Sequence, residues 1–262
     1  MESRELDVLV SRAADLIIKA RKMVVFTGAG ISTESGLPDF RSPGGIWERF
    51  DPDDFTYDKF ISDSGVRKKQ WRMLGEGGLT SHAEPNPAHL AIGELEKLGR
   101  LDCVITQNID NLHQRGGVPH SKVFELHGNM QWAICLDCRH RFPFEQVKVR
   151  LDAGEEDPYC ELCHGILKPD CVLFGEQLPA DVLKEATRRA AGCDLCLVIG
   201  STLVVYPAAY IPAYAVKSGA KLVIINLSST PMDHQAAVLI RAKAGETMTK
   251  IVQQVKAKTG MP

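Results

Sequence analysis

Long apolar runs, aromatic residues and an excess of charge of either sign are all scarce in this sequence. No stretch is long and apolar enough to span a membrane, and the N-terminal segment carries charges throughout, without the apolar core of a signal peptide. Aromatic residues make up 6% and the formal net charge is −2, so neither base-stacking surfaces nor a basic footprint for nucleic acid is predicted. We therefore expect a cytoplasmic protein, with a monomer favoured, that binds neither membranes nor nucleic acid directly.

The length and composition favour one large domain with room for a smaller insertion. The chain has 262 residues, of which 44% are hydrophobic and 24% charged, so it can bury an ample core. Its eight cysteines, in a protein expected in a reducing compartment, indicate metal ligands or reactive thiols rather than disulfides.

The most informative stretch lies near the start of the chain. Residues 23–26 form an apolar run that is typical of a strand buried on both faces. Gly28 and Gly30 follow, and they allow a tight turn against which a ligand can lie. Residues 31–35 favour a short helix whose free amide groups would suit a phosphate. An ordinary strand-to-helix turn stays open as an alternative. Thr33 stands where the dinucleotide fingerprint has its third glycine, so standard hydride transfer is not predicted.

Strand and helix patterns alternate along most of the chain. They predict strands at 101–106, 123–126, 194–199 and 221–225, and helices at 4–21, 87–98, 179–190, 207–217 and 246–258. This alternation predicts an α/β protein with a parallel, doubly wound sheet. The carboxyl edge of that sheet would collect the small and polar residues that follow four strands, namely Gly28–Ser32, Gln107–Asp110, Gly200–Thr202 and Asn226. Residues 44–80 differ, and their aromatic side chains favour the core of a small helical region over a binding face.

Four cysteines form two CxxC pairs. Cys135 and Cys138 are separated from Cys160 and Cys163 by a spacer of 21 residues, which a short helix near 143–151 would occupy. This pattern predicts a tetrahedral structural zinc site, because four thiolates leave no open position for a catalytic water. Two independent redox pairs are the less favoured alternative.

A third CxxC motif predicts no metal site. Cys193 and Cys196 lead into an apolar strand without a second pair nearby. Side chains at this spacing would point to opposite faces of a strand, or nearly so. We interpret both as buried small hydrophobic residues, and Cys103 and Cys171 likewise.

Several different short motifs follow one another along almost the whole chain. They are Gly28–Ser32, Pro38–Arg41, Thr106–Asp110, His127–Gly128, the four cysteines, Phe174–Glu176, Gly200–Leu203 and Asn226. Together they resemble the sirtuins, the NAD-dependent protein deacylases, in their compact bacterial and archaeal form. The resemblance implies a Rossmann-like NAD-binding domain of residues 1–40, 81–122 and 175–262. It also implies a small domain made of a helical insertion at 41–80 and a zinc ribbon at 123–174.

The resemblance implies that acyl groups, most simply acetyl, are removed from protein lysines, with nicotinamide and O-acyl-ADP-ribose as the other products. His127 would be the general base on a ribose hydroxyl, since an imidazole titrates near working pH. Read alone, His127 is more typical of a structural histidine. Asn108 would hold the ribose and orient a water, while Asp110 and Ile109 would hold the nicotinamide carboxamide. Phe40 would shield the reacting sugar from water.

The resemblance also assigns contacts with NAD and with the substrate. NAD would be held by Gly28, Ala29, Gly30, Ser32, Phe40, Arg41, Gln107, Asn108, Ile109, Asp110, Gly200, Ser201, Thr202 and Asn226. The acyl-lysine would lie against Val172, Phe174, Gly175, Glu176 and Val205. The peptide backbone would add as a strand between 172–176 and 202–206. Residues 70–73, Gln-Trp-Arg-Met, lack the Tyr-x-x-Arg pair of the branch that prefers succinyl- and malonyl-lysine, which argues against an acidic acyl group.

Three other functions stay open at this point. The first is NAD-dependent protein ADP-ribosylation, which shares the first step and differs in the acceptor. The second is a non-catalytic NAD-sensing module, which would not need both His127 and Asn108. The third, a dehydrogenase, is disfavoured because the dinucleotide fingerprint is incomplete.

Overall fold

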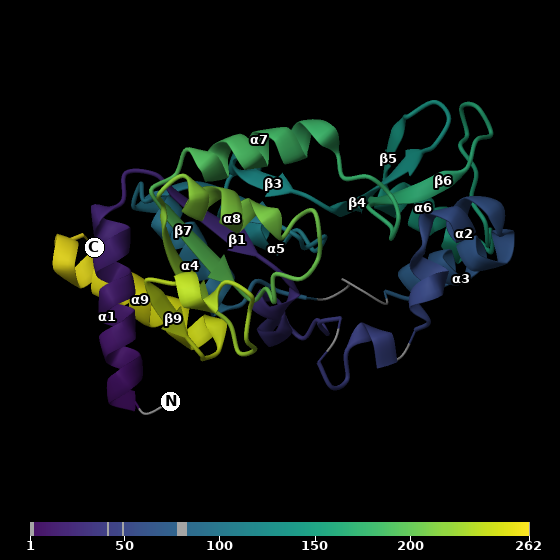
Figure 1. Cartoon of the computed structure of the whole chain (residues 1–262). Helices are drawn as coiled ribbons and strands as arrows, with labels where there is room; N and C mark the ends of the chain where they lie inside the picture. Colours follow the sequence, from purple (N-terminus) through teal and green to yellow (C-terminus); the bar gives the residue numbers. More distant parts are fainter. Residues whose placement is uncertain (1–2, 41, 49, 78–82, 262) are drawn as a thin grey trace.

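The computed structural model describes residues 3–40, 42–48, 50–77 and 83–261, which form two lobes joined side by side (Figure 1). The large lobe is built on a six-stranded sheet, and the small lobe on a three-stranded sheet. The predicted α/β class, with a parallel sheet and a smaller inserted module, is confirmed. The residue bounds given above for the two domains stay a prediction.

All strands of the large sheet are parallel. They are β1 (Met23–Thr27), β2 (Leu101–Thr106), β3 (Val123–Glu125), β7 (Leu195–Ile199), β8 (Lys221–Ile225) and β9 (Val238–Ile240). Their order, β3-β2-β1-β7-β8-β9, reverses direction between β1 and β7, which makes this point the topological switch of the sheet. Every residue of β1 and β7 is buried, as their apolar runs predict.

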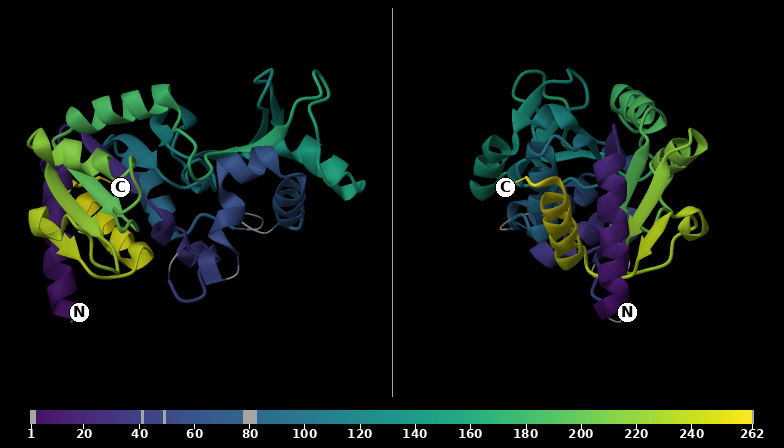
Figure 2. Two further views of the ribbon diagram at one scale, coloured as in Figure 1. Left: turned by 45° about the vertical axis from the view of Figure 1, so that its right-hand side comes forward. Right: turned by 90° about the vertical axis from the view of Figure 1, so that its left-hand side faces the viewer.

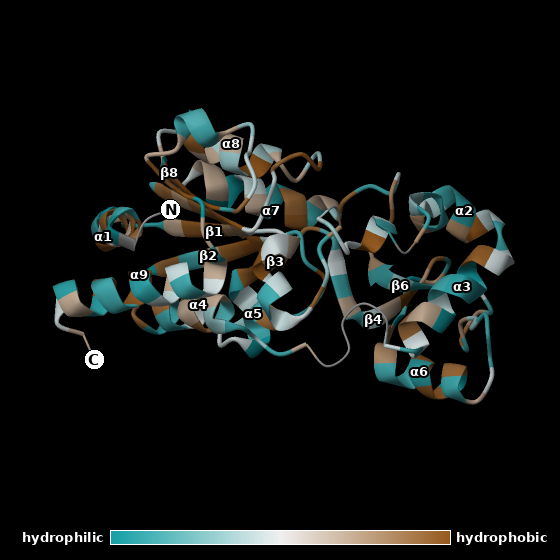
Figure 3. Cartoon of the chain, turned by 90° about the horizontal axis from the view of Figure 1, so that it is seen from below, coloured by the Kyte–Doolittle hydropathy of each residue, from teal (hydrophilic) through white to brown (hydrophobic). Residues whose placement is uncertain are grey.

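Helices cover both faces of this sheet (Figures 2 and 3). One face packs against α1 (Ser3–Lys19), α4 (Pro87–Lys97) and α9 (Ala244–Thr259), and the other against α7 (Ala180–Ala191) and α8 (Tyr210–Lys217). The predicted start of α4 is confirmed, because the Asn86 side chain accepts a hydrogen bond from the Ala88 amide and Pro87 is the first helical residue. Short α5 (Leu112–Arg115) follows β2.

Single-turn 3₁₀ helices occupy many of the connections. They are η1 (Ala29–Ile31), η2 (Thr33–Ser35), η3 (Ile46–Glu48), η4 (Pro52–Phe55), η5 (His120–Lys122) and η6 (Asp233–Gln235). In the part of the chain that the structure describes, no helix is both long and apolar enough to cross a membrane.

The small lobe combines the two insertions. Its antiparallel sheet has the order β5-β4-β6, with β4 (Gly128–Cys135), β5 (Arg141–Pro143), β6 (Leu167–Cys171) and the helix α6 (Phe144–Asp152). The helices α2 (Tyr57–Ser62) and α3 (Ser64–Gly75) pack against it. Phe60 and Trp71 from these helices are fully buried in one cluster with Ala133 and Leu167 of the sheet. The two insertions therefore share a single core.

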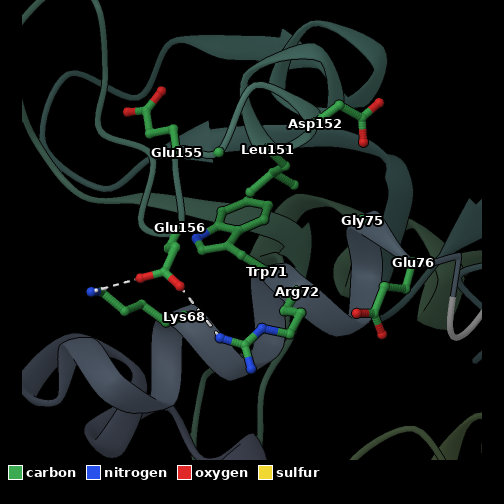
Figure 4. A pocket seen from close by; sticks show the side chains of 10 residues that line it. Lys68, Trp71, Arg72, Gly75, Glu76, Leu151, Asp152, Glu155 and Glu156 are labelled. Atoms are coloured by element: carbon green, nitrogen blue, oxygen red, sulfur yellow. Dashed lines mark hydrogen bonds and ion pairs between the residues drawn. The ribbon is translucent and has the colours of Figure 1, made fainter.

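A cavity of about 230 Å³ lies between α3 and α6 (Figure 4). Trp71 and Leu151 form its apolar part. Glu156 bridges it by ion pairs with Lys68 (3.1 Å) and Arg72 (3.4 Å). The cavity is a seam inside the small lobe and lies away from the sheet edge of the large lobe.

Candidate active site

Three glycines bring the loops after β1 and β7 into backbone contact. A Cβ on Gly28 would lie 2.9 Å from the carbonyl oxygen of Gly200, and a Cβ on Gly30 would lie 2.8 Å from the same atom. Gly200 itself has a φ of +64°, where a side chain would be strained. The glycines are therefore required by the close approach of the two loops at the switch point, whatever ligand lies there.

The amide groups of the turn after β1 are predicted to be free, but several of them are hydrogen-bonded. The Gly30 amide donates to the carbonyl of Gly200 (2.8 Å), and the amides of Ile31 and Ser32 donate to the carbonyls of Gly28 (3.1 Å) and Ala29 (3.0 Å). The predicted short helix exists as two 3₁₀ turns, η1 and η2, but its first amides are already hydrogen-bonded inside the turn. Tight 3₁₀ geometry closes these bonds locally, so residues 31–35 are not a row of free donors.

Buried polar side chains form a network beneath this turn. The Ser32 hydroxyl donates to Oδ2 of Asp110 (2.7 Å) and accepts from Nδ2 of Asn108 (3.1 Å). Oδ1 of Asp110 accepts from the Leu112 amide (3.0 Å), so this carboxyl group also supports the start of α5. The structure thus brings together three residues that the sequence predicts at this edge.

Two buried histidines complete the network, and the sequence analysis missed both. The ring of His89 lies against the ring of His113, with 5.0 Å between centroids, and its Nε2 lies 3.5 Å from the Ser32 hydroxyl. Nε2 of His113 lies 2.8 Å from Oγ1 of Thr27, which donates to Thr106. Burial lowers the pKa of His89 to about 4, against the opposing effect of Asp110, and lowers the pKa of His113 well below its usual range. A single histidine on a helix carries no local pattern that distinguishes such a role.

His127 stands just after β3, where the sheet edge meets the small lobe. Its Nδ1 lies 2.8 Å from the carbonyl oxygen of Gln107, which can only accept, so Nδ1 carries the proton and Nε2 is left as the basic nitrogen. Burial lowers the pKa of His127, partly offset by this hydrogen bond. The imidazole is therefore neutral at pH 7 and able to take a proton.

Two further strand ends contribute polar groups to the same edge. The side-chain Nε2 of Gln107 donates to the Ser201 hydroxyl (2.8 Å), and this bond joins the end of β2 to the loop after β7. Asn226, at the end of β8, is buried and donates to the carbonyl of Ser228 (2.9 Å), while Arg241 holds the Asn226 carbonyl (3.1 Å). Within the described residues, the amides of Ala29, Ser201 and Thr202 have no hydrogen-bond partner.

Aromatic rings gather between the two lobes. Trp47 contacts Phe40 (5.4 Å between ring centroids), Phe55 (5.7 Å) and Phe174 (5.5 Å). Phe40 and Phe174 are 39% and 46% exposed, so both rings remain accessible. The expectation that the aromatic residues of 44–80 form a core is therefore wrong for Trp47 and Phe55, which join this half-buried cluster, and confirmed for Phe60 and Trp71. Arg41 lies outside the described residues.

The segment expected to receive the acyl-lysine connects the lobes. The Val172 amide donates to the carbonyl of His127 (2.9 Å), and the Phe174 amide donates to the carbonyl of Phe55 (3.0 Å). Gly175 has a φ of +83°, and the side chain of Glu176 turns back to accept from the Leu173 amide (3.0 Å). Across the large lobe, the Val205 carbonyl accepts from the Ala209 amide (2.9 Å).

The four predicted metal ligands meet at one point of the small lobe. The Sγ atoms of Cys135, Cys138, Cys160 and Cys163 all lie within 4.8 Å of one another. Two of the pairs are 3.5 and 3.7 Å apart, close to the roughly 3.8 Å between sulfurs of a tetrahedral zinc–thiolate site. The donor set fits a zinc ion that is closed to water.

Among the described residues, the remaining cysteines belong to no cluster that could hold a metal. Cys103, Cys193 and Cys196 are buried, as predicted, and burial raises the pKa of all three. The expectation that Cys193 and Cys196 point to opposite faces is wrong, because Cys193 precedes β7 and both pack in the same cluster. Cys171 is only half-buried by its neighbours.

Comparison with known proteins decides the family. The model of the Sir2 family matches residues 28–207. The chain belongs to the Sir2 family. It is 47% identical over 251 residues to an NAD-dependent protein deacetylase of Thermodesulfovibrio yellowstonii, covering 95% of this chain and 96% of that one. It is 45% identical over 251 residues to NAD-dependent protein deacylase 2 of Archaeoglobus fulgidus, covering 94% and 96%.

Solved structures of Sir2 enzymes share the fold. One, described in terms of the mechanism and regulation of Sir2 enzymes, has a TM-score of 0.87 and 44% identity over 96% of this chain and 99% of that chain. Another holds a p53 peptide and NAD⁺, with a TM-score of 0.83 and 39% identity over 99% of each chain. A third holds a deacetylated p53 peptide and 3′-O-acetyl-ADP-ribose, with a TM-score of 0.84 and 38% identity over the whole of both chains.

Proposed function

We propose that this Sir2 protein removes acyl groups, acetyl first among them, from protein lysines at the expense of NAD. The products are nicotinamide, O-acyl-ADP-ribose and free lysine. The observation that carries the proposal is His127, a neutral imidazole whose Nδ1 is held by the Gln107 carbonyl and whose Nε2 is left as the base. It stands beside the Ser32–Asn108–Asp110 network at the switch point of the sheet.

In this proposal the loops at the switch point hold NAD. The phosphates lie against Gly28–Gly30, with the Ser201 and Thr202 amides as donors and Arg41 as the cation. Asn226 binds the adenosine ribose. Asn108, Asp110 and Ile109 hold the nicotinamide side, and Phe40 excludes water from the sugar. The Asn108 and Asp110 side chains are well suited to orient a ligand, because the Ser32 hydroxyl is hydrogen-bonded to both.

The acyl-lysine enters from the side of the small lobe. Val172, Phe174 and Val205 line its path, and His127 takes the proton from the ribose hydroxyl that receives the acyl group. A small neutral acyl group suits the surroundings. At residues 70–73, Gln70 is uncharged and its side chain donates to the Asp54 carbonyl (2.5 Å). Arg72 is already paired with Glu156 at the α3–α6 seam. Neither side chain therefore offers a free cation to an acidic acyl chain.

The four-cysteine site holds one structural zinc ion. Its ligands join β4 to the loop before β6, so zinc binding contributes to the folding free energy of the small lobe. We also place the protein in the cytoplasm as a monomer that takes acylated proteins or peptides as substrates and does not bind nucleic acid, in line with its net charge of −2.

The test is turnover of acetyl-lysine peptides with NAD, followed by mass spectrometry of all three products. We expect equal amounts of deacetylated peptide, nicotinamide and O-acetyl-ADP-ribose. A panel of longer and acidic acyl groups should be turned over more slowly than acetyl. Transfer of ADP-ribose to the peptide, without deacylation, would instead establish the ADP-ribosyltransferase alternative. If the peptide is neither deacetylated nor ADP-ribosylated, the proposal is overturned.

A further inference from the structure

A buried lysine stands next to the segment that connects the lobes. The side chain of Lys168, in β6, is only 3% exposed. Its Nζ donates to the carbonyls of Pro169 (3.1 Å) and Cys171 (2.5 Å) and pairs with Oε2 of Glu176 (3.1 Å). Three oxygen partners satisfy the three protons of the ammonium group.

The ion pair closes the chain into a loop. Lys168 precedes residues 172–174 and Glu176 follows them, so their contact fixes both ends of this short stretch. The same Oε2 atom of Glu176 also accepts from the Leu173 amide (3.0 Å), which anchors the middle. We name this loop, residues 168–176, the crossing loop.

Backbone hydrogen bonds attach the crossing loop to both sides of the active site. On one side, the Val172 amide donates to the carbonyl of His127 (2.9 Å). On the other, Phe174 exchanges two bonds with residues 55–57, at 3.0 and 2.9 Å. A shift of this loop would therefore move both the base and the aromatic cluster that Phe174 joins.

We propose that Lys168 and Glu176 are positioning residues that set the affinity for the acyl-lysine by holding the crossing loop in its binding shape. The proposal rests on the proposed function, since Val172 and Phe174 are the residues expected to receive the acyl chain. Lys168 acts through the loop and does not touch the substrate. Glu176, expected from the sequence as a substrate contact, acts in the same way, because its carboxylate is engaged inside the protein.

Lys168 is the buried member of this ion pair, whereas the Glu176 side chain is 23% exposed. Removing the carboxylate leaves the Lys168 ammonium without a counter-charge in a poorly solvated place, and the loop must rearrange to bring it closer to water. The rearranged loop would present Val172 and Phe174 differently to the peptide. NAD affinity should change much less than peptide affinity, since the loops after β1, β2, β7 and β8 supply most of its proposed contacts.

The small lobe offers a matched control. Arg67 and Asp157 form a second buried ion pair, with side chains 6% and 10% exposed and 2.9 Å between Nη2 and Oδ2. This pair joins α3 to the loop before Cys160 and makes no hydrogen bond to the crossing loop in the described residues. Its loss should cost stability without changing the acyl-lysine path.

The experiment compares Glu176→Gln, Lys168→Met and Lys168→Arg with Asp157→Asn. Binding of an acetyl-lysine peptide is measured directly, alongside KM and kcat for peptide and NAD, zinc content and Tm. We expect Glu176→Gln and Lys168→Met to weaken peptide binding by about tenfold or more, with a much smaller change in KM for NAD and with zinc content unchanged. Lys168→Arg, which keeps the charge, should restore most of the affinity. Asp157→Asn should lower Tm and leave peptide binding unchanged.

Two outcomes would overturn the proposal. One is unchanged peptide affinity in a folded Glu176→Gln protein, which keeps an oxygen for the Leu173 amide and is the milder variant if Lys168→Met does not fold. The other is an equal loss of peptide and NAD affinity in Glu176→Gln, together with the same two losses in Asp157→Asn. That result would show that both ion pairs have only a general structural role. If the wild-type protein binds acetyl-lysine peptide but turns none over, the proposed function fails while the peptide-binding comparison still tests the positioning role.

Discussion

The two lobes hold their functional side chains by different means. In the large lobe, helices on both faces of the sheet bury two extensive apolar clusters, and the polar side chains at the strand ends rest on that scaffold. In the small lobe, one smaller cluster is supplemented by four cysteines and by the ion pairs Arg67–Asp157 and Lys168–Glu176. The NAD side should therefore fold mainly through burial of apolar side chains, whereas the acyl-lysine side depends more on a metal and on buried charge.

Removing a zinc ligand should have the largest effect, and that effect should be confined to the small lobe. Structural zinc contributes roughly 10–16 kcal/mol of apparent binding free energy in small zinc modules. Cys135→Ala should therefore lose the metal, unfold the small lobe and abolish deacylation, while the large lobe keeps its fold. Zinc content and hydrogen exchange of the two lobes measure this.

The third CxxC motif supplies the control for the zinc variants. Cys193 lies in the large lobe, so Cys193→Ser should leave the zinc content unchanged. A metal-free Cys135→Ala protein with native exchange in the small lobe and normal turnover would show that the zinc assignment is wrong.

Loss of the general base should separate the two halves of the reaction. General bases typically contribute about 10²–10⁴-fold, so His127→Ala should lower deacylation by that factor. Nicotinamide exchange, which occurs before the base acts, should fall less, and NAD should still bind. Asn108→Ala or Asp110→Ala should lower exchange and deacylation together. Wild-type deacylation by His127→Ala would refute the assignment of the base.

The switch point should be sensitive to added volume. Gly28→Val would place a side chain within about 3 Å of the Gly200 carbonyl, and overpacking of this kind costs roughly 1–3 kcal/mol. We expect NAD affinity to fall at least tenfold, measured by calorimetry. Gly36→Asn is the control, since Gly36 has a positive φ that Asn tolerates and open space around its Cα. Unchanged NAD affinity in folded Gly28→Val protein would place the phosphates elsewhere.

The buried histidines should affect stability only as the pH falls below about 6.5. The pKa of His89 is lowered from 6.5 to about 4, so the unfolded chain binds a proton in this window that the folded protein does not. Stability is therefore fully present above pH 6.5 and is lost as the pH falls toward 4, by roughly 3 kcal/mol for this group. Urea unfolding between pH 7 and pH 5 measures the slope. His89→Gln should flatten it in part, because His113 acts in the same direction. An equally steep slope in that variant would exclude His89 as its source.

Much of this molecule follows from local patterns in the sequence. The apolar runs place five of the six strands of the large sheet to within a residue or two, and Asn86 and Pro87 mark the start of α4. The four cysteines identify their own cluster, because two CxxC pairs carry their spacing with them. The edge residues, including Ser32, Asn108 and Asp110, follow from a rule that parallel strands present their carboxyl ends together.

Other features escape such patterns. Three-residue β9 and the strands of the small lobe are too short, or too irregular in alternation, to predict as strands. Cys193 and Cys196 share a face because β7 begins after Cys193, which spacing alone does not reveal. The sequence predicts free amides at Ile31 and Ser32, but both are hydrogen-bonded in the fold.

Local sequence patterns predict most strands and helices of the large lobe and the four clustered cysteines, whereas the role of His127 as the base comes from the family resemblance and stays a prediction. Three contacts depend on the tertiary fold: Gly28 and Gly30 pack on Gly200, the rings of His89 and His113 meet edge to face, and Lys168 reaches Glu176. The physical reason is distance along the chain. A strand, a cap or a CxxC turn is decided by neighbours a few residues away. The state of a buried glycine, histidine or lysine is decided by groups that only folding brings within hydrogen-bond or van der Waals range.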